Sequence, residues 1–367
     1  MQVINDNYEA FLTLVRLGLG HKADIQTSAV DWKIVCAIAN AQGLSAVVLD
    51  GLEFIVGVKE NGEYKQLLPD KLVLTKWIGE VIQGYERRYE LYKHAIADMA
   101  GFYSKYGIKM MILKGYACSM DWPRPAHRPC GDIDIWQFGE QKRGDALLAK
   151  EKGIIVDKGH HHHTVFYWGN FMVENHYDFV NVHVRRSSAE IEKVFKDLGK
   201  DDTYSVELYG EKVYLPSPNL HALFLMKHAV SHFTGANITL RQVLDWAFFV
   251  EKHTNEIDWE WLMDNLDHFH MIVFFHCINA ICVEDLGFDA NIFPEIRFMP
   301  SLKERILSDI LAPSFSGAEP KNLWPRLLFK YRRWKGNAWK QEICYSESRW
   351  SSFLSGIWAK LLKPSSI

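Results

Sequence analysis

Two carboxylates stand two residues apart in a short apolar run. Asp132 and Asp134 alternate with Ile133 and Ile135 in the sequence GDIDI. If the run is a strand, both carboxylates point to the same face, because side chains alternate across a strand. Such oxygen ligands hold Mg²⁺ together with substrate phosphates, and a pair of ions held this way can clamp an in-line phosphoryl transfer. Taken alone, however, an Asp-x-Asp run is more often a solvated strand end or turn.

Two glycines flank this segment. Gly131 directly precedes the pair and would let the backbone turn sharply. Lys114-Gly115 follows the apolar run 108–113, and forms a turn at which a phosphate could approach main-chain N–H groups. Neither glycine is decisive alone, but both are compatible with a nucleotide-binding site.

The stretch 113–136 resembles the nucleotidyltransferase superfamily that includes DNA polymerase β. Within that superfamily, it resembles a family of poorly characterised bacterial proteins with LKG, a Tyr/Trp-Pro segment and R-P-x-G-D-I-D. That family also carries a Glu-x-His triplet on a later strand, then Leu-Pro-x-Pro and helices with two histidines and an Arg/Asp pair. The matching residues are Leu113-Lys114-Gly115, Trp122-Pro123, Arg128-Pro129, Gly131-Asp132-Ile133-Asp134, Glu174-Asn175-His176, LPSP at 215–218, His228, His232, Arg241 and Asp245.

The resemblance implies transfer of a nucleoside monophosphate from an NTP to an acceptor hydroxyl, with release of pyrophosphate. Asp132, Asp134 and Glu174 would ligate Mg²⁺ (or Mn²⁺), and a second ion would lower the pKa of the acceptor hydroxyl. Glu174 could also act as the base. Lys114 and Arg128 would offset phosphate charge, lysine as a point charge and arginine by bidentate contact.

One departure from the family pattern leaves an alternative open. Active superfamily members mostly have Ser or Gly after the first glycine, whereas this chain has Tyr116, with Ser119 displaced by three residues. A catalytically degenerate protein that binds a nucleotide or a partner is therefore the alternative. A second rival is an Asp-x-Asp glycosyltransferase that uses a nucleotide-sugar, but it leaves Glu174 without a role.

Asp178 is a rival for the third carboxylate. Glu174 and Asp178 are separated by an even number of residues, so in a regular strand both would face the same side. The Glu-x-His match favours Glu174. His176, beside the two carboxylates, and Asp178 are both candidates for the substrate cleft.

Two groups of histidines are spaced so that a metal site has to be considered. His160–His163 is an uninterrupted run, but alternation allows at most two of the four to face one ion, so we expect a structural or loop role. His228 and His232 share a helix face, yet the Glu of a zinc HExxH motif is absent; we expect packing or contact with substrate. Arg241 and Asp245 are also four apart, which predicts an intrahelical ion pair or a helix face that borders the cleft.

Two C-terminal segments could bind larger partners. Basic and aromatic residues without acids fill 321–340, as in RNA-binding surfaces, although a solvated helix face is equally common. The tail 350–363 could lie on a membrane interface but more often such a segment packs on its own domain.

Hydrophobic periodicity predicts the elements that must position these residues. Helical spacing covers Asn7–Leu52 and Thr75–Tyr106 and returns after the prolines of LPSPN. The region between predicts an α+β fold with a mixed sheet, flanked by helical regions, and we divide the chain into 1–106, 107–215 and 216–367. Strands are expected at 109–113, 132–136, 164–168, 171–174, 179–184 and 203–208, with a helix near 140–151; further helices are expected at His221–Phe233, Thr239–Lys252, Trp259–Asn265 and Phe269–Val283.

Composition and charge limit the classes of partner that the protein is expected to bind. The 367 residues carry 42 Lys and Arg against 45 Asp and Glu, a net charge of −3, so no global field attracts nucleic acid or an anionic membrane. The N-terminal residues lack the basic start and the small-residue cleavage site typical of a signal peptide, and the apolar run Met271–Val283 is too short to span a bilayer. We therefore expect a cytoplasmic protein with no membrane span, an NTP donor and an acceptor that is a small molecule, a protein or RNA.

Overall fold

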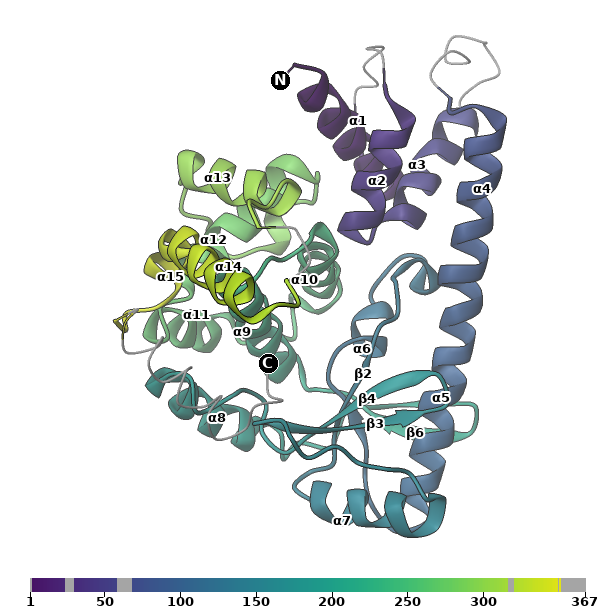
Figure 1. Ribbon diagram of the computed structural model, residues 1–367, viewed down its shortest axis with the longest axis vertical. Helices are drawn as coiled ribbons and strands as arrows, with labels where there is room; N and C mark the ends of the chain where they lie inside the picture. The colour runs from purple at the N-terminus through teal and green to yellow at the C-terminus, as the bar shows by residue number, and fades with distance from the viewer. Residues whose placement is uncertain (1, 24–29, 58–67, 316–319, 349, 351–367) are drawn as a thin grey trace.

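The computed structural model describes residues 2–23, 30–57, 68–315, 320–348 and 350. In these ranges one six-stranded mixed sheet is surrounded by helices (Figure 1). The strand order is β3-β4-β2-β1-β6-β5, with β2 parallel to β4 and β1 parallel to β6. The strands are β1 (Met111–Ile112), β2 (Ile133–Trp136), β3 (His163–Trp168), β4 (Phe171–His176), β5 (Ser205–Leu208) and β6 (Glu211–Tyr214).

A long helical rod runs along one side of the molecule (Figure 1). It consists of α4 (Lys71–Val81), a π-helical turn (Ile82–Glu86) and α5 (Arg87–Ser104). The long or broken helix predicted for Thr75–Tyr106 is therefore confirmed. The helices that precede the rod, as predicted, are α1 (Gln2–Gly18), α2 (Trp32–Gln42) and α3 (Ser45–Gly57).

The remaining helices lie within or after the sheet region. Short helices α6 (Tyr116–Ser119) and α7 (Gln141–Leu147), the latter continued by π-helical Leu148–Lys152, connect the strands, as does the 3-10 turn Pro125–His127. The later helices are α8 (Arg186–Leu198), α9 (Pro218–Gly235), α10 (Leu240–His253), α11 (Trp259–His268), α12 (Ile272–Ala280) with π-helical Ile281–Asp285, α13 (Pro300–Leu311), α14 (Leu323–Gly336) and α15 (Ala338–Cys344), with a 3-10 turn at Ala290–Ile292.

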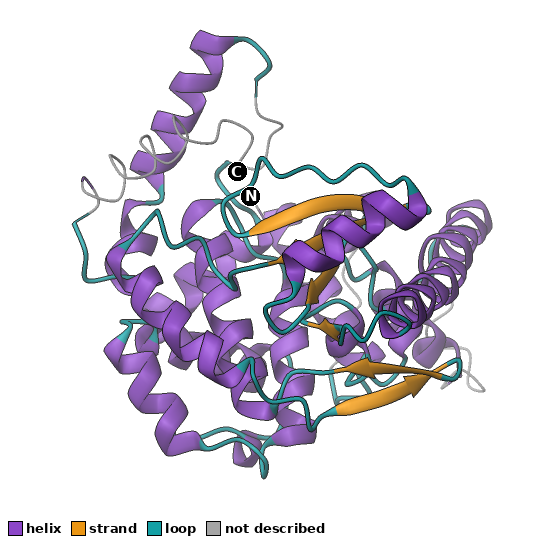
Figure 2. Cartoon of the chain, turned by 90° about the horizontal axis from the view of Figure 1, so that it is seen from below, coloured by secondary structure: helices purple, strands orange, loops and turns teal. Residues whose placement is uncertain are grey.

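The central strands β1 and β2 are buried, and their side chains belong to two hydrophobic cores. Figure 2 shows the strands among the helices. Ile133, Ile135 and Val173 point into a core shared with α5, which contributes Tyr92. Trp136, which alternates with them, belongs instead to the larger core formed by the N-terminal and C-terminal helices. Because Asp134 lies between the two isoleucines, its side chain points away from α5.

The region 177–198 differs from the sequence prediction. The strand expected at 179–184 is wrong, because this segment is a loop followed by α8, which the sequence analysis missed together with β6. Glu192 of α8 accepts hydrogen bonds from the backbone N–H groups of Phe179 and Val180, each at 3.0 Å. A carboxylate thus satisfies the donors that a neighbouring strand would otherwise have bonded.

Two other expectations concern the C-terminal half. The buried helix predicted for Met271–Val283 is confirmed, since most of α12 is buried. Within the described ranges, no helix combines the length and apolar character needed to cross a membrane. The three-part division of the chain stays a prediction, and most of the tail 350–363 lies outside the described residues.

Candidate functional site

The carboxylates of Asp134 and Glu174 are side by side at the middle of the sheet. Strands β2 and β4 pair in parallel, with Asp134 opposite Glu174 and Trp136 opposite His176. The side chain of Asp134 is 1% exposed and that of Glu174 is 19% exposed. Ligand atoms of Asp134, Glu174 and His176 all lie within 4.8 Å of one another. The register thus brings a buried and a reachable carboxylate together.

Two cations stabilise the buried carboxylate. Oδ1 of Asp134 lies 3.0 Å from Nζ of Lys114 and 3.1 Å from Nε2 of His176. Burial alone would raise the pKa of Asp134, but Lys114 and His176 hold it well below its ordinary value. Conversely, burial would lower the pKa of His176, but the hydrogen bond to Asp134 and the nearby negative charge of Glu174 raise it to about 9. Near neutral pH this pair is therefore ionised on both sides.

Asp132 lies directly before β2 and is half-buried. Its carbonyl accepts a hydrogen bond from the Tyr92 hydroxyl at 2.8 Å, which fixes the backbone at the start of the strand. Burial raises the pKa of the Asp132 carboxyl, and repulsion from Asp134 and Glu174 adds to the effect, while Lys114 opposes it. Three carboxylates around one lysine leave negative charge to be neutralised. Their hard oxygen donors are of the kind that Mg²⁺ takes.

The turn at Gly115 requires glycine. Its φ is 62° and its ψ is −101°, and an added Cβ would overlap the Tyr92 hydroxyl. Gly131, by contrast, is exposed, with nothing within 4 Å of an added Cβ and no left-handed φ, so the backbone there does not need glycine.

The hydroxyl of Ser119 is used internally. Ser119 is fully buried, donates to the carbonyl of Tyr116 at 2.7 Å and lies 3.0 Å from the Tyr89 hydroxyl. The Ser119 hydroxyl is therefore already used within the protein.

Arg128 is bound to the protein itself. Its Nε and Nη2 donate to both carboxylate oxygens of Asp245 at 2.7 and 2.9 Å, and Nε1 of Trp122 donates to Asp245 Oδ1 at 2.9 Å. The intrahelical pair predicted between Arg241 and Asp245 is thus wrong, because Asp245 is occupied by residues of the Trp-Pro and Arg-Pro segments. The i, i+4 rule considers only residues of the same helix, whereas the partner of Asp245 comes from a segment that packs against α10.

Arg241 remains beside these groups with unused donor capacity. Its Nε is buried and has no hydrogen-bond partner among the described residues. Burial lowers the pKa of Arg241, and the nearby Arg128 lowers it further, whereas Asp245 and Asp132 oppose this effect. Arg241 is therefore a cation near Asp132 whose Nε–H is not used by the described residues.

Asp178 lies apart from the carboxylate pair. It follows β4 and its Oδ1 is 3.0 Å from Nζ of Lys196 on α8. Its backbone carbonyl accepts from Nδ1 of His176 at 3.1 Å. The structure thus brings Glu174, rather than Asp178, next to Asp134, while the assignment of the third ligand stays a prediction.

Histidines from two other segments border this cluster. On α9, the rings of His228 and His232 are 4.4 Å apart, and burial together with Lys114 lowers the pKa of both, to about 4 for His232. Burial also lowers the pKa of His162 to about 2 and of His163 to about 3. The sequence analysis did not place His162 or His163 at the site; the signal available was that their run leads into the strand paired with the Glu-x-His strand.

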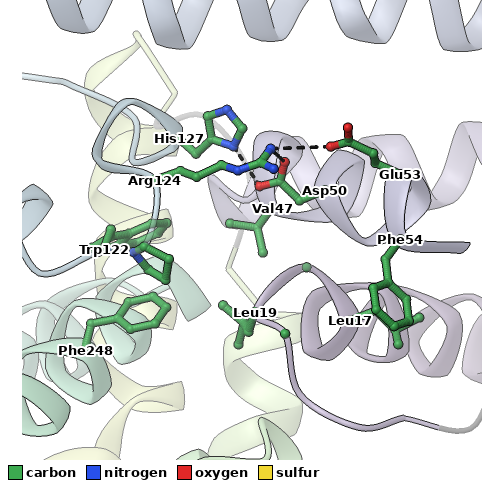
Figure 3. A pocket seen from close by; sticks show the side chains of 13 residues that line it. Leu17, Leu19, Val47, Asp50, Glu53, Phe54, Trp122, Arg124, His127 and Phe248 are labelled. Atoms are coloured by element: carbon green, nitrogen blue, oxygen red, sulfur yellow. Dashed lines mark hydrogen bonds and ion pairs between the residues drawn. The ribbon is translucent and has the colours of Figure 1, made fainter. Parts of the chain in front are cut away.

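A separate cavity of about 290 Å³ lies between α1, α3 and the Trp-Pro segment (Figure 3). Asp50, Trp122, Arg124 and His127 are among its lining residues. Nδ1 of His127 lies 2.7 Å from Asp50 Oδ2 and its Nε2 lies 3.2 Å from Glu86 Oε1. None of the predicted site residues lines this cavity. The ion pairs here join the segment 122–128 to α3 and to the π-helical turn of the rod.

Comparison with known proteins agrees with the class of protein that this site indicates. A family model described as "uncharacterised nucleotidyltransferase" matches residues 28–287. The chain therefore belongs to that family of nucleotidyltransferases. A crystal structure of an antigenic nucleotidyltransferase-like protein from Paracoccidioides brasiliensis is similar at 15% identity and a TM-score of 0.33, covering 48% of this chain and 85% of the other. No curated protein matches the sequence.

Proposed function

We propose that this protein is a Mg²⁺-dependent nucleotidyltransferase that moves a nucleoside monophosphate from an NTP to an acceptor hydroxyl and releases pyrophosphate. The observation that carries the proposal is the parallel register of Asp134 and Glu174, with Asp132 directly before the same strand. All three carboxylates interact electrostatically with Lys114, and hard oxygen donors of this kind would suit Mg²⁺. Membership in the nucleotidyltransferase family supports the same reaction class.

Asp132, Asp134 and Glu174 would hold the ions. Bound Mg²⁺ (or Mn²⁺) would neutralise the triphosphate and lower the pKa of the acceptor hydroxyl. Glu174 is the most accessible member of its pair with Asp134, which suits it to receive the proton of that hydroxyl.

The phosphate contacts that we propose differ in part from those implied by the family motif. Lys114 lies at the carboxylates and would act as a point charge on the triphosphate. Nε and Nη2 of Arg128 both donate to the Asp245 carboxylate. Arg128 would therefore position the segment 122–128 against α10. Arg241, with its unpartnered Nε, would take the direct phosphate contact.

Calorimetric titration tests this proposal. ATP, CTP, GTP and UTP are titrated in Mg²⁺ and in EDTA into the wild type, Asp134→Asn and Asp197→Asn, the last an exposed carboxylate on α8. We expect one triphosphate to bind in Mg²⁺ only, and Asp134→Asn but not Asp197→Asn to abolish binding. Equal binding in EDTA and in Asp134→Asn would refute the metal-dependent site.

A second candidate is a family member that binds a nucleotide without transferring it. It is favoured by Tyr116 at the serine position and by the buried, internally bonded hydroxyl of Ser119. Incubation with radiolabelled NTP and a cell extract separates the two: a transferase labels an acceptor, whether small molecule, protein or RNA, in a Mg²⁺-dependent manner. UDP-sugars in the same titration test the glycosyltransferase rival, and cytoplasmic residence stays part of the proposal.

A further inference from the structure

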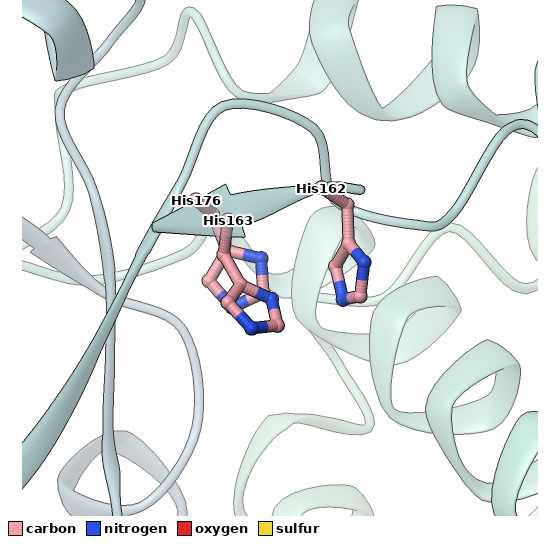
Figure 4. Close-up of side chains that lie close together, drawn as sticks. All are labelled: His162, His163 and His176. Carbon is pink, nitrogen blue, oxygen red and sulfur yellow. The ribbon is translucent and has the colours of Figure 1, made fainter. Parts of the chain in front are cut away.

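Three imidazole rings converge beside the carboxylate cluster (Figure 4). His162 lies just before β3, His163 is the first residue of β3, and His176 is the last residue of β4. His163 and His176 are opposite each other in the antiparallel ladder. Each of the three residues offers a ligand atom, and these atoms lie within 4.8 Å of one another. The loop before β3 breaks the strand alternation, so two consecutive histidines reach the same place.

Two of these rings carry unused nitrogens. Nδ1 of His162 and Nδ1 of His163 are buried and have no hydrogen-bond partner in the described part of the chain. The His163 side chain is only 8% exposed. Buried polar atoms normally have a partner, and these two nitrogens have a lone pair or a proton with which to bind one.

Glu174 lies beside two of the three rings. Its Oε2 lies 3.7 Å from Nδ1 of His163 and 3.7 Å from Nε2 of His176. These contacts are too long for hydrogen bonds. They are close to the ligand–ligand separation of about 3.4 Å in a tetrahedron with metal–ligand bonds of about 2.1 Å.

The orientation of His176 is already that of a metal ligand. Its Nδ1 donates to the Asp178 carbonyl, which leaves Nε2 directed at the carboxylates. Metal-binding histidines commonly have such a backbone partner on the second nitrogen, which fixes the tautomer and the ring. An ion bound at Nε2 would take the place of the proton now shared with Asp134, and that proton would leave to solvent.

We infer that His162, His163, His176 and Glu174 form a site for a first-row transition-metal dication of the Zn²⁺ class. Imidazole nitrogen suits Zn²⁺, Co²⁺ and Ni²⁺, whereas Mg²⁺ takes oxygen ligands. The site is therefore distinct in chemistry from the Mg²⁺ carboxylates, although the two share Glu174. It does not depend on the proposed nucleotidyl transfer, because imidazole nitrogens contribute most of its ligands.

Titration with Co²⁺ tests the inference, since the visible spectrum of Co²⁺ reports coordination number directly. Metal-free protein is titrated in excess Mg²⁺, with circular dichroism to verify folding. The variants are His162→Asn, at a partly exposed ligand, His163→Gln, and His94→Ala, which removes an exposed histidine on α5 that stacks on Tyr209. Asp132→Asn is included because Asp132 belongs to the Mg²⁺ site alone.

We expect the wild type, His94→Ala and Asp132→Asn to bind one Co²⁺ with the strong absorption of a four-coordinate ion, which Zn²⁺ displaces. His162→Asn should weaken Co²⁺ binding at least about tenfold. The inference is overturned if the wild type shows only the weak spectrum of a six-coordinate ion, or if His162→Asn binds like the wild type. Because the wild-type spectrum and His162→Asn decide the result, the experiment stays decisive even if His163→Gln misfolds. Loss of Mg²⁺-nucleotide binding in Asp132→Asn with Co²⁺ retained separates the two sites.

Discussion

Arg128 and Asp245 form a buried bidentate ion pair across 117 residues of sequence, with contacts of 2.7 and 2.9 Å. Arg128 lies four residues before Asp132, and Asp245 lies in the middle of α10. Trp122 donates to the same carboxylate. The segment that leads to the carboxylate strand is therefore fixed against the C-terminal helices.

Removing one partner of this pair should destabilise the fold strongly. Asp245→Asn leaves the Arg128 guanidinium buried without a counter-charge, and breaking such a pair costs about 3–5 kcal/mol. Urea unfolding should show this loss in the free energy of unfolding. Glu80→Gln, which removes an exposed pair with Lys76 on α4, should change it by less than about 1 kcal/mol. A similar small effect of Asp245→Asn would contradict the positioning role of the pair.

Gly115→Ala should damage the site through packing and backbone strain. The added Cβ would overlap the Tyr92 hydroxyl, and the positive φ of 62° is unfavourable for alanine. We expect a loss of about 1–3 kcal/mol in the free energy of unfolding and weaker nucleotide binding. Combining Gly115→Ala with Tyr92→Phe removes the overlapping atom, so it should recover part of the stability but not the strain. No recovery at all would show that the overlap is not the cause.

A glycine contact between α1 and α3 provides an independent stability test. A Cβ at Gly51 would overlap the Leu14 carbonyl, and one at Gly18 would overlap that of Val47. Gly51→Ala should therefore cost about 1–3 kcal/mol because the helices must separate. Gly79→Ala on α4 has nothing within 4 Å of the new Cβ and should be neutral or stabilising by up to about 1 kcal/mol, since alanine favours helix. Thermal unfolding of both variants decides the point.

The stability contributed by His176 should decrease at alkaline pH. Its pKa is raised to about 9 in the folded protein by Asp134 and Glu174, against burial. A raised pKa gives stabilisation that is complete below about 6.5, the unfolded value, and is lost as the pH rises through about 9. In EDTA, the difference in free energy of unfolding between wild type and His176→Gln should therefore shrink from pH 6 to pH 9.5. A constant difference over this range would exclude the proton-linked contribution.

The sequence predicted the site strands better than their surroundings. Asp132, Asp134 and Glu174 were predicted as site residues because motif residues were matched at specific positions. Alternation with Ile133 and Ile135 correctly assigned Asp134 to one face of β2. The strand expected at 179–184 failed because Glu192, twelve or more residues away, satisfies its backbone donors. The predicted partner of Asp245 was wrong for a similar reason. Its carboxylate binds Arg128, which is distant in sequence, and not Arg241, its i, i+4 neighbour.

The histidine run shows the same limit. Alternation predicted that consecutive histidines face opposite sides, so it did not predict that His162 and His163 both lie close to His176, because that depends on where β3 begins. Nor could periodicity show that His163 would pair with His176 in the ladder. Strand register, which is set by tertiary contacts, decides such convergence.

The sheet order also determines how the site responds to thermal fluctuation. Strand β2 lies between β4 and β1, and β4 lies between β3 and β2, so neither carboxylate strand is an edge strand of the described sheet. Edges and loops open in low-energy local fluctuations, whereas interior ladders open only in larger cooperative ones. The separation of Asp134 and Glu174 is thus set by an interstrand spacing that persists until the central ladder itself dissociates. Backbone amides of β2 and β4 should accordingly exchange with deuterium among the slowest of the chain.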